Sequence, residues 1–140
     1  MQYKHIDDTY FVFIQKDEFV NKTLTEFCKN RGIQTAEISG IGAVKDIEIG
    51  AYDPVEKKYI TKTYSKTYEL ISFNGNITLK DGEPFVHAHL TLGDHDMNIL
   101  GGHLFEMKVA VVGEFIIKKV NVDIHRKLDS EIGLATWNLS

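Results

Sequence analysis

Three histidines lie close enough along the chain to bind one metal ion. Apolar and polar residues alternate through Phe85–Leu92, as they do on a strand, so His87 and His89 share a face. Their attachment points would be about 7 Å apart, and two imidazoles can converge from there on one ion with bonds of about 2.0 to 2.1 Å. His103 follows Gly101–Gly102, a pair that permits unusual backbone angles or close approach to another segment. This pattern predicts a three-histidine site.

Three neutral nitrogen ligands with an open fourth position are typical of a catalytic or exchangeable zinc site more than of a closed structural one. Imidazole also suits iron, copper and nickel, so the residue types do not fix the metal. The alternative interpretation is a pair of histidines on a solvated face and a plain glycine turn before the third. The residues alone leave both interpretations open.

Two further residues are candidates for catalysis. Glu114 interrupts the apolar strand Val109–Ile117 and needs a partner if it is buried. It could accept a hydrogen bond from a ligand histidine or act as a general base beside the metal, or simply reach solvent. His95, between Asp94 and Asp96, could be a fourth ligand or an exposed loop residue.

The elements that must position these residues are mostly strands. We expect a strand over 10–15, a helix capped by Asp17 that runs to Arg31 with Gly32 as its stop, and then a strand-rich remainder. Hairpin turns are expected at 53–57, at Asn74–Gly75 and at Asp81–Gly82. The expected strands are 35–41, 44–52, 58–64, 69–73, 76–80, 85–92 and 108–122, with a short closing segment at 134–139. This order predicts an α+β fold, with one N-terminal helix packed on a mainly antiparallel sheet.

Composition fits one ordinary globular domain over residues 1–140. The chain is 43% hydrophobic and 26% charged, and no apolar run approaches the roughly 18 residues of a membrane span. The first residues are too charged for a signal peptide, so we expect a cytoplasmic protein with no membrane partner. Cys28 lies on the apolar side of the expected helix and is predicted to be a buried thiol.

The motifs Pro84–Leu90 and Gly101–Leu104, then a strand that carries Glu114, with Ile38–Ala43 upstream, resemble the plants-and-prokaryotes-conserved (PPC) domain family in its stand-alone prokaryotic form. The resemblance extends over nearly the whole chain. It implies an α+β fold, a homotrimer, and a zinc-type divalent ion bound by His87, His89 and His103. The family is also similar in fold to acetolactate decarboxylase, which by itself says little about activity.

Members of the PPC family are commonly described as DNA-binding, and this sequence offers little to support that role. The net charge is −4, there is no Arg-Gly-Arg-Pro hook, and Arg31 and Arg126 are the only arginines available for reading guanine. The best candidate for phosphate contact is one basic stripe, which could instead protect an edge strand. It consists of Lys58, Lys62 and Lys66 with Tyr64 and Tyr68.

A cupin is the main rival fold, because Gly82, the paired histidines, Asp94 and Gly101 roughly imitate the first cupin motif. The imitation fails where a glutamate is expected at position 94, and His103 arrives too soon for a second motif. Two functions remain. One is a trimeric regulatory or DNA-associated module in which the ion is structural or vestigial. The other is a metal-dependent enzyme, lyase- or hydrolase-like, or a small-ligand-binding protein that uses Glu114 or His95.

Overall fold

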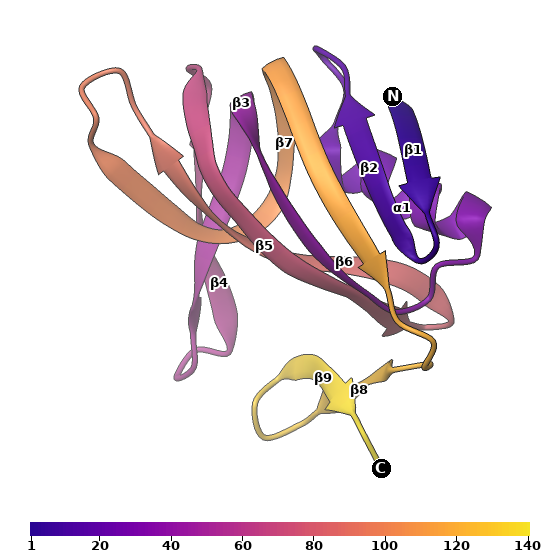
Figure 1. Cartoon of the computed structure of the whole chain (residues 1–140). Coiled ribbons are helices and arrows are strands. Elements are labelled where there is room, and N and C mark those ends of the chain that lie inside the picture. The colour runs from indigo at the N-terminus through magenta and orange to yellow at the C-terminus, as the bar shows by residue number, and fades with distance from the viewer.

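The computed structural model describes residues 1–140 and contains one helix and nine strands (Figure 1). It confirms the expected α+β class with a mainly antiparallel sheet. No helix is long and apolar enough to cross a membrane. The elements are β1 (Gln2–Ile6), β2 (Thr9–Ile14), α1 (Val20–Arg31), β3 (Ala36–Asp53), β4 (Lys58–Tyr64), β5 (Tyr68–Lys80), β6 (Glu83–Gly93), β7 (Ile99–Lys119), β8 (His125–Asp129) and β9 (Leu134–Asn138).

Four long strands form a closed ring of pairings. β3 pairs with β5 and with β7, and β6 pairs with the free edges of the same two strands, all antiparallel. β2 extends the sheet beside β7, and β1 lies on β2. β4 pairs only with β3, while the β8–β9 hairpin touches β5 through a single parallel bridge and stands below the main sheet in Figure 1. Residues 89–93 of β6 close the ring against residues 99–103 of β7, and β4 is an edge strand.

The structure confirms two of the three expected hairpin turns and contradicts the third. The 53–57 turn joins β3 to β4, and Asp81–Gly82 joins β5 to β6 with positive φ at both residues. Asn74–Gly75 is not a turn, because β5 continues through it as one strand. A Cβ on Gly75 would stand 2.5 Å from the carbonyl oxygen of His87. Glycine is present there because β6 approaches closely, and the chain does not reverse.

The long strands also differ from the expected segmentation. The two strands predicted over 35–41 and 44–52 form the single strand β3, which carries an irregularity between Gly40 and Gly42. A Cβ on Gly42 would meet the carbonyl oxygen of Val112 at 2.1 Å, so glycine again marks a place where two backbones nearly touch. The expected break between residues 41 and 44 is therefore wrong, because Gly40 and Gly42 lie inside a strand and do not end it.

The helix begins later than predicted. Asp17 is not the N-cap: it has a positive φ of 69°, and the cap position belongs to Phe19, whose side chain makes no capping hydrogen bond. The carboxylate of Glu106 on β7 caps the helix instead. It accepts hydrogen bonds from the backbone N–H groups of Asn21 (2.8 Å) and Lys22 (3.1 Å). An acid from a distant strand satisfies the free donors of the first turn and fixes the helix to β7.

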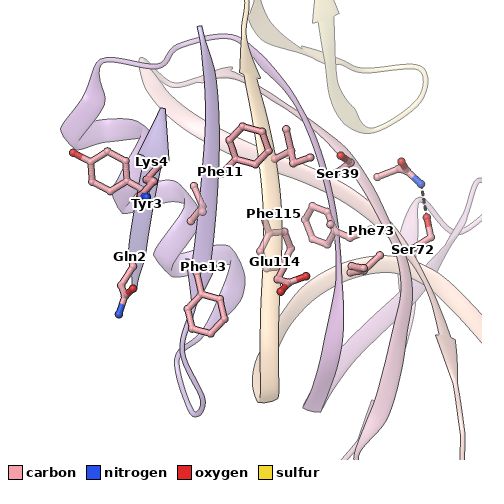
Figure 2. A pocket seen from close by; sticks show the side chains of 15 residues that line it. Gln2, Tyr3, Lys4, Phe11, Phe13, Ser39, Ser72, Phe73, Glu114 and Phe115 are labelled. Carbon is pink, nitrogen blue, oxygen red and sulfur yellow. Dashed lines mark hydrogen bonds between the residues drawn. The ribbon is translucent and has the colours of Figure 1, made fainter. Parts of the chain in front are cut away.

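On the face of the sheet opposite α1 lies a hollow of about 760 Å³ (Figure 2). Phe11 and Phe13 of β2 and Ile41 of β3 line it and are 52%, 39% and 55% exposed. Glu114 lies among these apolar side chains, beside Phe13. The hollow face therefore leaves apolar side chains of neighbouring strands open to solvent.

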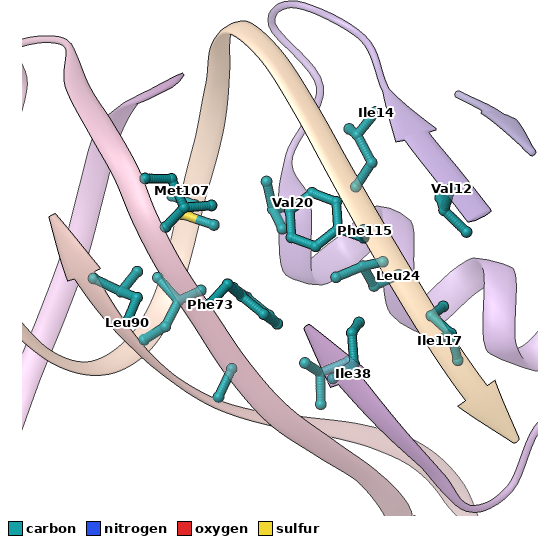
Figure 3. Packing of buried hydrophobic residues seen from close by; sticks show 14 of the residues in the cluster. Val12, Ile14, Val20, Leu24, Ile38, Phe73, Leu90, Met107, Phe115 and Ile117 are labelled. Atoms are coloured by element: carbon teal, nitrogen blue, oxygen red, sulfur yellow. The ribbon is translucent and has the colours of Figure 1, made fainter. Parts of the chain in front are cut away.

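The core fills the space between the sheet and α1 (Figure 3). Phe73 of β5 and Phe115 of β7 meet edge to face, with ring centres 5.2 Å apart. The helix ends at Gly32 as expected, in a left-handed conformation. Its buried face consists of Val20, Leu24, Phe27 and Cys28. Burial raises the pKa of the Cys28 thiol to about 12, which confirms the expected inert, buried cysteine.

Candidate metal centre

The structure brings His87, His89 and His103 together on one patch of the sheet. His89 and His103 are direct cross-strand partners on β6 and β7, and His87 lies two residues away from His89 on the same face. The buried residues of β6 alternate with the histidines, as the sequence predicts. The side chains of His87 and His103 are half-buried, and that of His89 is exposed. Strand alternation and one cross-strand pair therefore assemble the cluster.

The spacing of the three rings suits a tetrahedral ion. Ring centres are 5.3 Å apart for His87 and His89, 5.2 Å for His87 and His103, and 5.4 Å for His89 and His103. An imidazole centre lies about 3.2 Å from a metal that its nitrogen binds, so three rings around a tetrahedral ion have centres about 5.2 Å apart. One ligand nitrogen from each ring lies within 4.8 Å of the other two.

His103 Nδ1 gives a second sign that the cluster lacks a binding partner. It is buried and has no hydrogen-bond partner in the protein. A buried imidazole nitrogen without a partner is costly, and coordination of a cation is one way to satisfy it. The donor set therefore fits a borderline metal ion that prefers nitrogen ligands.

The glycine pair before His103 acts through close approach. A Cβ on Gly101 would lie 2.4 Å from the carbonyl oxygen of Leu90 on β6, and one on Gly102 would lie 2.9 Å from that of Gly50 on β3. Neither glycine has a positive φ. The pair lets β7 pass tightly between β3 and β6 at the point where His103 must face the other two histidines.

Two aromatic rings, those of Tyr59 and Phe105, cover His103, and neither is among the predicted site residues. Tyr59 of β4 stacks on it with ring centres 4.6 Å apart, and Phe105 lies 4.9 Å away at a steep angle. Along β4, Tyr59 alternates with Lys58 and Lys62 of the lysine stripe, so its side chain points to the opposite face of the strand. This alternation is the one sequence pattern that indicates the inward orientation of Tyr59. Burial is the largest cause that raises the pKa of Tyr59, so its phenol stays protonated near neutral pH.

Arg126 is the other missed residue, and it stands beside His87. Its guanidinium is held by several polar contacts, none of them with a carboxylate. These contacts are Nε to Thr78 Oγ1 (2.8 Å), Nη1 to the Ala135 carbonyl oxygen (3.1 Å), Nη2 to Asn76 Oδ1 (2.9 Å) and Nη2 to His87 Nδ1 (3.3 Å). The only sequence signal was that Arg126 is one of two arginines.

A cavity of about 300 Å³ opens beside His87 and His103. Its wall combines polar and apolar groups from seven elements of the fold. The lining residues are Asn21, Tyr59, Lys80, Phe85, Val86, His87, His103, Leu104, Phe105, Arg126, Leu134 and Ala135. The candidate metal centre therefore has an adjoining space large enough for a small molecule.

The electrostatic environment keeps two of the histidines neutral. Burial, with Arg126 and His89 nearby, lowers the pKa of His87 to about 4. Burial, with His87, His89 and Arg126 nearby, lowers the pKa of His103 to about 4. Neutral imidazole is the form that binds a metal, so both residues are available as ligands well below pH 7.

These two shifts predict an acid-sensitive stability for the metal-free protein. Between about pH 6.5 and pH 4 the unfolded chain takes up protons at His87 and His103 that the folded protein does not, so the free energy of unfolding falls as the pH is lowered. Each partly solvated ring contributes on the order of 1 kcal/mol. Urea unfolding with a chelator, at about pH 7 and about pH 4.5, measures the loss. This loss of unfolding free energy should become smaller when His87 and His103 are both replaced by alanine. Replacement of the exposed His5 and His125 by alanine should leave it unchanged.

Glu114 does not reach the histidines within one chain. Cross-strand pairs connect His89 to Asn74, Asn74 to Ser39, and Ser39 to Ile116, two residues from Glu114 on β7. Three strand spacings along the sheet, a path of roughly 14 Å, separate the histidine from that segment. Glu114 is exposed and lines the hollow face. Its placement gives it no contact with the cluster through which to act as a base or hydrogen-bond acceptor in a single chain.

His95 also lies apart from the cluster. It is exposed in the loop between β6 and β7, where the Asp94 carboxylate accepts hydrogen bonds from Asp96 and Asn98 and so holds the turn. The group of residues that could hold one ion contains His87, His89 and His103 without it.

Solved structures resemble the whole chain. A protein from Bacteroides thetaiotaomicron, described as a "putative dna binding protein", is 31% identical with a TM-score of 0.95, covering 98% of this chain and 96% of its own. A PPC protein from Pyrococcus horikoshii is 39% identical, with a TM-score of 0.88 and coverage of 98% and 94%. A metal-containing protein from Archaeoglobus fulgidus is 31% identical, with a TM-score of 0.88 and coverage of 99% of both chains. No curated protein matches the chain.

The sequence also matches a family model. The Plants and Prokaryotes Conserved (PCC) domain, the same family as PPC, matches residues 1–121. The match includes the three histidines and ends before Arg126. With 39% identity to a PPC protein across nearly the full chain, it confirms the resemblance read from the motifs. The chain belongs to the Plants and Prokaryotes Conserved domain family.

Proposed function

We propose that this protein binds one divalent, zinc-type ion through His87, His89 and His103 and uses it to hold a small molecule in the adjoining cavity. The observation that carries the proposal is the near-equilateral arrangement of the three rings, whose centres lie 5.2 to 5.4 Å apart. The orphaned His103 Nδ1 and the neutral state of two ligands support it. The archaeal neighbour described as metal-containing supports it further.

A bound ion of this kind acts as a Lewis acid toward an oxygen atom of a ligand. The protein's own residues supply the rest. Tyr59 and Phe105 pack on His103 and restrict the orientation of its ring. Arg126 places a positive charge at the wall of the cavity. Three histidines leave a coordination position open, so the arrangement favours an exchangeable ligand over a closed structural site.

Metal analysis tests this proposal. Purified protein dialysed against Zn²⁺ and then against metal-free buffer should retain about one ion per chain. Parallel dialysis against Co²⁺, Ni²⁺ and Cu²⁺ would rank the metals that the site accepts. A wild-type chain that retains no metal from any of these solutions would contradict the proposal.

We also propose that the hollow face is where copies of the chain associate, as a homotrimer. Phe11, Phe13 and Ile41 expose apolar surface that a monomer rarely leaves contiguous. Ile41→Glu should dissociate the assembly in light-scattering measurements. Ile60→Glu is the matched control, since Ile60 is equally exposed (58%) but lies on edge strand β4. A wild-type protein that is monomeric in the same measurement would contradict the proposed homotrimer.

Association with DNA is a second candidate function. It is favoured by the structural neighbour described as a "putative dna binding protein" and by the exposed stripe Lys58, Lys62 and Lys66 along and just beyond β4. The same lysines lie on an edge strand, where they also discourage pairing with other chains. Real phosphate contacts must weaken steeply with added salt, so a duplex-binding assay across salt concentrations tests this function. Affinity that does not change with salt would remove it.

A further inference from the structure

We propose that the cavity beside the three histidines binds a small organic carboxylate, whose anionic group is received by Arg126. This inference deepens the proposed function, because it names the class of molecule that the metal centre would hold. It rests on the charge, the polar contacts and the apolar wall of the cavity.

The cavity carries positive charge that no acid neutralises. Arg126 and Lys80 both line it, and neither forms an ion pair. Both cations lie over the ring of Phe85, with Arg126 Cζ 5.2 Å and Lys80 Nζ 5.0 Å from its centre. Glu83, the cross-strand neighbour of Lys80, is paired with Lys29 at 2.8 Å instead. Two unpaired cations beside a site for a third form a strong site for an anion.

Arg126 is held in place for this task. Thr78, Asn76 and the carbonyl oxygen of Ala135 accept three of its N–H groups at 2.8 to 3.1 Å. A fixed guanidinium loses little freedom when it binds a carboxylate with two parallel hydrogen bonds. The fork geometry favours a planar carboxylate over a spherical ion.

Metal binding would free one more donor of Arg126. In the structure Arg126 Nη2 donates to His87 Nδ1 at 3.3 Å, which requires a lone pair on that nitrogen. If His87 binds a cation through Nδ1, the lone pair is used; if it binds through Nε2, Nδ1 carries the proton. In both cases Arg126 loses this acceptor. A ligand carboxylate beside the metal would replace it.

The rest of the wall indicates what the carboxylate is attached to. Phe85, Phe105, Leu134 and the side chain of Ala135 give the cavity an apolar surface, and its 300 Å³ suits a molecule of modest size. Both buried side-chain atoms that the fold leaves without a partner, His103 Nδ1 and Asn21 Oδ1, also belong to lining residues. An apolar or aromatic body with one carboxylate matches this wall better than an inorganic anion does.

The specificity would come from outside the region that defines the family. Arg126, Leu134 and Ala135 belong to the β8–β9 hairpin, beyond the matched residues 1–121. The histidines lie within those residues. The residues that the family model matches therefore provide the metal ligands, and the C-terminal hairpin provides the group that recognises the anion.

Calorimetry with benzoate as the probe tests the inference on the zinc-loaded, full-length protein. Wild type should bind benzoate, and Arg126→Ala should weaken binding by about 10- to 100-fold, as expected for loss of a charge-assisted pair. Lys127→Ala is the matched control, because it removes the same charge from the neighbouring, exposed position of β8. It should leave the affinity unchanged.

Two further variants protect the test if Arg126→Ala fails to fold. Lys80→Ala removes the second cation from an exposed position and should weaken benzoate by several-fold. Ala135→Leu fills the cavity without changing charge and should weaken benzoate more than formate, which has no apolar body. Phosphate that binds as tightly as benzoate would overturn the assignment of an organic carboxylate.

Metal content measured on the same samples separates the two proposals. Protein that holds zinc but does not bind benzoate at about 10 mM overturns the carboxylate site and leaves the metal centre standing. Protein that holds no zinc overturns the proposed function, and the carboxylate site with it. Zinc loading should also tighten benzoate binding relative to chelator-treated protein. Equal affinity in the two forms would overturn the coupling between Arg126 and the metal centre.

Discussion

Replacement of His103 by alanine is expected to lower zinc affinity by more than about 100-fold, because loss of a direct ligand exceeds the effect of losing a supporting residue. His103 is the one ligand that comes from β7, so the other two histidines cannot complete a tridentate site without it. Competition with a chromophoric chelator measures the change. Excess zinc should raise the melting temperature of the wild type and leave that of the variant unchanged.

The control for this substitution is His95→Ala, which removes an exposed histidine from the loop beyond β6. It should retain wild-type zinc affinity. His103 also packs on Tyr59 and Phe105, so a second variant, His89→Ala, separates metal loss from packing loss because His89 is exposed. Zinc affinity that survives both His103→Ala and His89→Ala would show that the metal lies elsewhere.

Leu90→Ala is expected to destabilise the protein by about 2 to 4 kcal/mol, the usual cost of an emptied core position. Leu90 follows His89 on β6 and points to the opposite face, where it is 5% exposed within the core (Figure 3). The substitution therefore tests the alternation that places the histidines. Denaturant unfolding measures it as a lower midpoint without a change in slope.

Leu128→Ala on β8 is the matched control, since the same atoms are removed from a side chain that is 69% exposed. It should cost less than about 0.5 kcal/mol. If the two substitutions cost the same, β6 would be shifted by one residue, and its histidines would face the core.

The candidate site could be predicted largely because β6 alternates without interruption. Buried and accessible residues follow one another from Val86 to Leu92, so the shared face of the two histidines follows from a period of two. The pairing of His89 with His103 could not be read in this way. It depends on the register between β6 and β7, which the loop at Asp94 and the close approach at Gly101 set together.

The fold class was predictable, and the strand lengths were not. Asn74–Gly75 has the composition of a turn, yet β5 runs through it because Gly75 admits the backbone of His87. The late start of α1 depends on Glu106, 85 residues beyond the Asn21 amide that it accepts from. Local patterns do not report such long-range contacts. Arg126 escaped notice for the same reason.

The ring of pairings implies an uneven distribution of local opening across the proposed metal centre. Where β3, β5, β6 and β7 are paired on both edges, as at residues 89–93 of β6, hydrogen exchange of the backbone amides should require nearly global unfolding. β4 and the β8–β9 hairpin have free edges and should exchange through much smaller openings. His89 and His103 are paired on both edges and should stand on the slowest-exchanging part of the molecule, with His87 two residues outside it. Tyr59 and Arg126, which flank the cluster, should therefore be able to move aside while His89 and His103 keep their places.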